Sequence, residues 1–132
     1  MPEIKQLKVI VAEDDIGMAE IACHKLSTAG FNVRHAENGL KAVEMFGQDP
    51  PDIMLLDLMM PEMDGFQVLQ KIRDNPDKKL AATPVIVLSN LWSNEDILKT
   101  QALKVDDYLV KAYFTPDEIL GKIKTVLSKH RG

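Results

Sequence analysis

Two kinds of apolar pattern alternate along the chain. Short apolar runs rich in β-branched side chains predict β-strands. They lie at 8–12, 31–36, 53–57, 84–89 and 107–110. Between them, apolar residues recur at three- and four-residue spacing, which predicts helices over 17–29, 40–46, 66–73 and in the segments after Ser93 and Thr115. Residues 76–83 are polar and predict a loop. Five repeats of a strand and a helix predict a parallel sheet with helices on both faces.

The last two helices begin with clear capping signals. Ser93 is followed three residues later by Asp96, a pattern related to the capping box, and Trp92 and Ile97 occupy the positions of a hydrophobic staple. Thr115–Glu118 is a full capping box with proline at the first helical position. These signals indicate where both helices begin.

One apolar run contains a single carboxylate. Residues 53–61 read IMLLDLMMP, and Asp57 lies in the middle. A lone buried aspartate costs several kcal/mol unless its charge is compensated. The run is shorter than the roughly 20 residues that span a bilayer, so we interpret it as a strand buried on both faces. Asp57 then lies at the carboxyl end of that strand, where ligands bind in open α/β sheets.

Length and composition indicate one domain covering residues 1–132. The net charge is −4, with acidic and basic residues interspersed, which argues against general binding to nucleic acids or membranes. Cys23 is the only cysteine, and residues 1–6 lead into a short strand rather than a long apolar leader. We therefore expect a cytoplasmic protein.

The polar residues that stand out all follow predicted strands. Glu13-Asp14-Asp15 follows the first strand, Asp57 closes the third, Ser89 closes the fourth and Lys111 follows the fifth. Because parallel strands share one carboxyl edge, these side chains are expected to converge. Converging carboxylates repel unless a cation joins them, and Mg²⁺ prefers such oxygen ligands. A lysine and a hydroxyl beside a metal-bound carboxylate form a site for a phosphoryl group.

These motifs resemble the receiver domain of bacterial two-component response regulators along nearly the whole chain. The matching segments are Glu13-Asp14, LLDLMMPEMDG (55–65), PVIVLS (84–89) and DDYLVK (106–111). The resemblance implies a doubly wound, flavodoxin-like five-stranded parallel sheet of order 2-1-3-4-5 with five helices. It also implies a phosphorylation-activated switch, not an enzyme that acts on other substrates.

The resemblance also assigns roles to individual residues. Asp57 is the expected phosphoacceptor, assisted by Ser89 and Lys111. The expected Mg²⁺ ligands are Glu13, Asp14, Asp57 and the backbone carbonyl of Met59, with Glu13 acting at least through water.

Ser89 and Tyr108 occupy the switch positions of the family. Phosphorylation is expected to remodel the surface made by the fourth helix, the fifth strand and the fifth helix, which controls a partner or output. The same surface is available for homodimerisation, although no residue demands it. The phosphodonor implied is a phosphohistidine on a sensor histidine kinase or a histidine phosphotransfer protein.

Other interpretations of these residues stay open at this point. A phosphatase of the haloacid dehalogenase type also forms an aspartyl-phosphate after a strand, but it uses a second aspartate at the position of Met59. A pseudo-receiver, which only binds partners, normally lacks part of the acidic and lysine set. Considered individually, Asp15 reads as a helix cap and Tyr108 equally as a packed aromatic. The three histidines, at 24, 35 and 130, read as surface residues.

Three positions depart from the family pattern. Ala112 replaces the proline that commonly follows the lysine in a cis peptide, and we expect a trans bond there because a cis non-proline bond costs roughly 3–4 kcal/mol. Asn90 replaces a small residue and is expected to crowd the pocket. Lys104 replaces a glycine that commonly ends the fourth helix, so we expect that helix to close differently.

Overall fold

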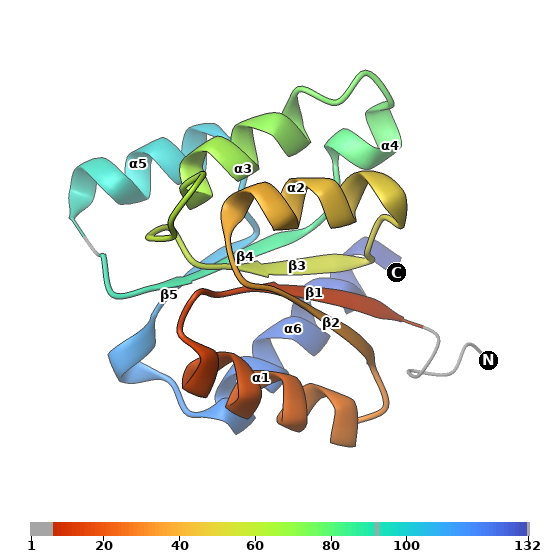
Figure 1. Ribbon diagram of the computed structural model, residues 1–132, viewed down its shortest axis with the longest axis vertical. Helices are drawn as coiled ribbons and strands as arrows, with labels where there is room; N and C mark the ends of the chain where they lie inside the picture. Colours follow the sequence, from red (N-terminus) through yellow and green to blue (C-terminus); the bar gives the residue numbers. More distant parts are fainter. Residues whose placement is uncertain (1–6, 92, 132) are drawn as a thin grey trace.

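The computed structural model describes residues 7–91 and 93–131 (Figure 1). Within them, five strands form one parallel sheet in the order β2-β1-β3-β4-β5, so the predicted fold class and strand order are confirmed. The strands are β1 (Lys8–Ala12), β2 (Asn32–Ala36), β3 (Ile53–Leu56), β4 (Val85–Ser89) and β5 (Asp107–Val110). The order changes direction between β1 and β3, which leaves a crevice at the carboxyl ends of these strands.

Helices cover both faces of the sheet (Figure 1). Helices α1 (Ile16–Thr28) and α6 (Pro116–Arg131) lie on one face. The other face is covered by α2 (Gly39–Gln48), α3 (Gly65–Arg73) and α5 (Asn94–Ala102), with the short α4 (Lys78–Ala81) beside them. In the described part of the chain there are six α-helices, not the five expected, because Asp77 caps a single turn inside the segment predicted as a loop.

Each face of the sheet has its own apolar core, as the alternation of side chains along a strand requires. In β1, Val9 and Val11 join the core under α1 and α6, whereas Ile10 and Ala12 join the core under α2 and α3. The three central strands β1, β3 and β4 are buried on both faces, which explains their continuous apolar sequences.

The predicted helix starts are confirmed. The Asp96 N–H donates to the Ser93 hydroxyl oxygen (3.1 Å), and the Thr115 and Glu118 side chains each accept the other residue's backbone N–H (3.2 and 2.9 Å). The staple assigned to Trp92 lies outside the described residues. Asn38 is the N-cap of α2, and its side chain accepts the Lys41 N–H.

The expectation that α5 closes without the family geometry is wrong. Lys104 adopts the left-handed conformation (φ 57°) that glycine usually supplies. The Lys104 N–H donates to the Gln101 carbonyl (2.9 Å) and the Val105 N–H to the Thr100 carbonyl (3.3 Å), which together form a Schellman motif. Arg73 supports this turn, because its guanidinium group donates to the carbonyls of Leu103 (2.7 Å) and Lys104 (3.1 Å).

Candidate functional site

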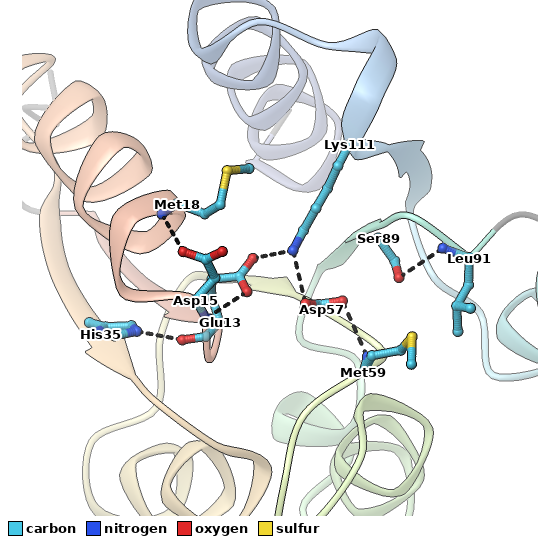
Figure 2. A network of polar contacts seen from close by, with 9 residues as sticks. All are labelled: Glu13, Asp15, Met18, His35, Asp57, Met59, Ser89, Leu91 and Lys111. Carbon is cyan, nitrogen blue, oxygen red and sulfur yellow. Dashed lines mark hydrogen bonds and ion pairs between the residues drawn. The ribbon is translucent and has the colours of Figure 1, made fainter.

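The sheet register brings the predicted site residues to one edge. Ala12 is paired with Leu56, and Leu56 with Val87, so the residues after β1 and β3 leave the sheet side by side. Glu13 and Asp57 therefore face each other across the crevice, with Lys111 reaching in from the end of β5 (Figure 2).

A buried ion-pair network forms the centre of this site. The Lys111 ammonium lies 2.5 Å from Oε1 of Glu13 and donates to Oδ2 of Asp57 at 2.9 Å. Only 6% of the Glu13 side chain and 7% of the Asp57 side chain are exposed. Two carboxylates at this depth require a cation, because an unpaired buried charge is costly. Lys111 supplies that cation in the structure described.

The pKa values of two groups reflect this arrangement. Burial raises the pKa of the Glu13 carboxyl, and the nearby Asp57 carboxylate adds to the rise, although hydrogen bonds from Lys111 and Asp15 oppose it. Burial by itself lowers the pKa of Lys111, but the hydrogen bonds to Glu13 and Asp57 outweigh it, so the pKa of this ammonium is raised. Lys111 therefore stays protonated throughout the physiological range.

Three carboxylates are placed to share a metal ion. Glu13, Asp14 and Asp57 each offer a carboxylate oxygen within 4.8 Å of the other two. Asp14 is exposed at the mouth of the crevice, whereas the other two are buried. A donor set made only of oxygen suits a hard divalent cation such as Mg²⁺ or Mn²⁺ rather than zinc. The residues present therefore fit the divalent ion that the sequence predicts.

Backbone contacts fix the segment after β3. The Asp57 N–H donates to the Ala12 carbonyl (3.0 Å), and the Met59 N–H donates to Oδ1 of Asp57 (3.2 Å). The Met59 side chain is 61% exposed. Gly65 lies so close to this segment that a Cβ atom there would approach the Asp57 carbonyl oxygen to 2.3 Å. The loop is thus held in place from both of its ends.

The two predicted switch residues meet at Leu91. The Ser89 hydroxyl is buried at the end of β4 and accepts the Leu91 N–H (3.3 Å). The Tyr108 hydroxyl donates to the Leu91 carbonyl. Burial, with smaller contributions from Asp96 and Asp57, raises the pKa of Tyr108 to about 12, so this hydroxyl remains a donor. No hydrogen bond joins Ser89 to Asp57 among the described residues.

Sequence reasoning missed one contact of the acidic pair. The His35 ring is exposed, as expected, but its Nε2 donates to the Glu13 carbonyl oxygen (2.6 Å). The register of β2 on β1, which pairs Val11 with His35, places this ring at the same edge of the sheet. The interpretation of Asp15 as a cap is confirmed, because its side chain accepts the Met18 N–H at the start of α1.

Lys111 begins a short helical turn. Residues Lys111–Tyr113 form a 3-10 helix after β5. The expected trans bond before Ala112 is confirmed, since every peptide bond in the described ranges is trans. Lys111 therefore reaches Asp57 without the cis-proline that commonly follows it in the family.

Fold and site together define a flavodoxin-like α/β domain with an acidic, lysine-containing pocket at the carboxyl edge of its sheet. The sequence matches the family described as the response regulator receiver domain over residues 9–124. The chain belongs to this family, and is thus a receiver domain of two-component signalling. Receiver domains bind a divalent metal at an acidic pocket, and the Glu13, Asp14 and Asp57 cluster is such a pocket.

Similar sequences are found in regulators of transcription. The chain is 36% identical over 122 residues to a probable transcriptional regulator, ycf27, of Guillardia theta. This match covers 92% of this chain and 46% of that protein. It is 32% identical over 122 residues to RpaA of Synechocystis, a DNA-binding dual master transcriptional regulator, covering 92% of this chain and 49% of that protein. The chain thus spans about half the length of the curated relatives it matches.

Solved structures of similar sequence share the fold. The receiver domain of the Francisella response regulator 1452 is 31% identical, with a TM-score of 0.83, and the match covers 94% of this chain and 98% of that one. A Mn²⁺-bound form of response regulator Rcp1 is 27% identical, with a TM-score of 0.76 and 88% of each chain covered.

None of the helices in the described ranges has the length and hydrophobicity needed to cross a membrane.

Proposed function

We propose that this domain is a phosphorylation-activated signalling switch in which Asp57 accepts a phosphoryl group. The observation that carries the proposal is the buried Asp57 carboxylate, which lies 2.9 Å from the Lys111 ammonium and within reach of two further carboxylates. Phosphoryl transfer depends mainly on positioning and on neutralising the charge of the phosphoryl oxygens. This pocket offers both.

In the proposed reaction, an Asp57 carboxylate oxygen attacks phosphorus in line with the leaving group. The new oxygen–phosphorus bond replaces the phosphorus–nitrogen bond of a phosphohistidine donor, and the donor imidazole leaves with a proton from solvent. Lys111 already donates to Asp57, and its ammonium group would then bind a phosphoryl oxygen.

Glu13, Asp14, Asp57 and the Met59 carbonyl would hold Mg²⁺, which supplies charge neutralisation for the phosphoryl oxygens. Lys111 is bound to both Glu13 and Asp57 in the structure described. A divalent ion would give Glu13 a second cationic partner, and Lys111 would then be available to bind the phosphoryl group. In the structure described, Lys111 alone therefore neutralises both carboxylates, a task that it would share with the divalent ion.

The proposed output depends on Ser89, Tyr108 and Leu91. Ser89 accepts the Leu91 N–H and Tyr108 donates to the Leu91 carbonyl. A phosphoryl group on Asp57 offers the Ser89 hydroxyl a charged acceptor, which would draw the β4–α5 segment inward and disturb both bonds. Tyr108 would then turn inward, and the surface of α5, β5 and α6 would change. This is a population shift driven by the better contacts of one state.

The proposed partners follow from the reaction. A sensor histidine kinase or a histidine phosphotransfer protein supplies the phosphoryl group, and the α5–β5–α6 surface engages an output partner or a second copy of the chain. Because similar proteins are transcriptional regulators, we propose that this domain controls an output domain. We place this exchange in the cytoplasm, where the single cysteine, Cys23, stays reduced.

Incubation with acetyl phosphate and Mg²⁺ tests the proposal. We expect one phosphoryl adduct per chain in intact-mass spectra and none on Asp57→Asn, because an amide oxygen is a far weaker nucleophile. Asp64→Asn is the matched control, since Asp64 caps α3 outside the pocket and asparagine also caps helices. Continuous turnover of phosphodonor would indicate a phosphatase, and the absence of any adduct would indicate a pseudo-receiver.

A further inference from the structure

A cavity lies between α1, α6 and the sheet. Its volume is about 170 Å³, and most of its lining is apolar. Ala22 contributes from α1, Leu120 from α6, and Val11 and Leu88 from the sheet. Figure 1 shows α1 and α6 side by side beneath the sheet.

Helix α1 contributes both small and large side chains to this cavity. Ala22 lines it together with Met18, Ile21 and Leu26. Leu26 is buried, whereas Ile21 is 54% exposed. The space beside the short Ala22 side chain is not filled by its neighbours, because close-packed interiors relax only partly around a void.

The lining of the cavity is mainly apolar but includes four charged residues. Three of them, Glu13, Asp57 and Lys111, belong to the ion-pair network. The fourth, Lys25, pairs with Asp117 across α1 and α6 (2.7 Å). These charged groups are therefore already paired, and the rest of the lining offers mainly apolar contact.

We propose that this cavity binds a small, uncharged aromatic molecule of about one ring. An apolar cavity of about 150 Å³ in another protein stays dry and binds benzene, and the cavity of this chain is of similar volume. A charged ligand would lose its hydration without gaining an unpaired partner, which excludes ions. The proposed ligand contacts the apolar walls, while Glu13, Asp57 and Lys111, which also line the cavity, stay paired with one another.

Toluene titration of the metal-free protein tests the proposal. We expect saturable amide shift changes in ¹⁵N NMR spectra at Ala22 and Leu120, and a rise in the midpoint of thermal unfolding of about 5 °C at ten times the dissociation constant. Benzoate, which has the same ring with a negative charge, is expected to leave both signals unchanged. Equal binding of benzoate would overturn the assignment of an uncharged ligand, and no saturable shift with toluene would overturn the site.

Two substitutions locate the binding. Ala22→Leu places a larger side chain in the cavity and is expected to abolish the toluene response. Ala102→Leu makes the same change on the exposed side of α5, away from the cavity, and is expected to keep the response in full. A toluene response that survives in Ala22→Leu would place the site elsewhere. If Ala22→Leu does not fold, the shift map of the unchanged protein decides, since shifts confined to other residues refute the proposal.

Discussion

Gly39 offers a sharp test of how the site loop is held. This residue begins α2, and its α-carbon lies against the loop that follows Asp57. A Cβ atom added there would lie 1.7 Å from the carbonyl oxygen of Met63 and 2.6 Å from its carbonyl carbon. Gly47, in the same helix, has open space around the corresponding position. The two glycines therefore form a matched pair.

The size of the expected effect follows from these distances. The Met63 oxygen would have to retreat by about 1.7 Å to reach an ordinary contact distance, and as a backbone atom it cannot turn away as a flexible side chain does. Overpacking of this kind costs about 1–3 kcal/mol. In contrast, alanine at an exposed helical position such as Gly47 stabilises a helix by roughly 0.5–1 kcal/mol.

Urea unfolding followed by circular dichroism measures both changes. We expect Gly39→Ala to lower the free energy of unfolding by about 1–3 kcal/mol and Gly47→Ala to raise it by about 0.5–1 kcal/mol. Because Met63 and the predicted metal ligand Met59 lie in the same loop, Mg²⁺ titration of folded Gly39→Ala should also show weaker binding than in Gly47→Ala. Equal stability of the two variants would show that the loop yields freely, and our reasoning on Gly39 would be wrong.

Three further predictions follow from the turn, the acidic pair and the loop surface. Lys104→Gly removes a left-handed lysine and should stabilise the domain by about 1 kcal/mol in urea unfolding, whereas a loss of stability would contradict the strain argument. Burial raises the pKa of Glu13, so the folded protein binds more protons than the unfolded chain and loses stability as pH rises through this raised pKa. The free energy of unfolding of Glu13→Gln minus that of the parent should therefore increase from about pH 4 to pH 7 without divalent ions, and a flat difference would refute it. Met59 and Leu91 are apolar and hold no water for in-line attack on a phosphorylated Asp57, so Met59→Asn combined with Leu91→Glu should speed dephosphorylation about tenfold. An unchanged decay in Mg²⁺ would show that these positions do not control water access.

Local sequence signals predicted most elements and the residues that start them. The apolar runs located all five strands, and Ser93 and Thr115 cap the helices that follow them. These signals succeed because strand burial and helix capping depend on side chains within a few residues of each other. The short α4 was missed because one turn capped by Asp77 has no apolar repeat to reveal it.

Lys104 shows where a local rule was insufficient. The absence of glycine predicted a different helix end, yet the Schellman bonds form and Arg73, from α3, binds the carbonyls of the same turn. A non-glycine residue accepts the left-handed conformation when contacts from elsewhere in the fold outweigh its cost. Those contacts come from residues distant in the sequence, so no local sequence pattern predicts them.

The sequence by itself determined the fold class, the strand order implied by its motifs, and the set of residues at the carboxyl edge of the sheet. It placed Glu13, Asp57 and Lys111 together because parallel strands end at a common edge. Only the tertiary structure decided that Lys111 binds both carboxylates, that Ser89 and Tyr108 meet at Leu91, and that a cavity remains beneath α1. These features depend on side-chain packing and distances between elements far apart in the chain, whereas periodicity records only which side of an element faces the core.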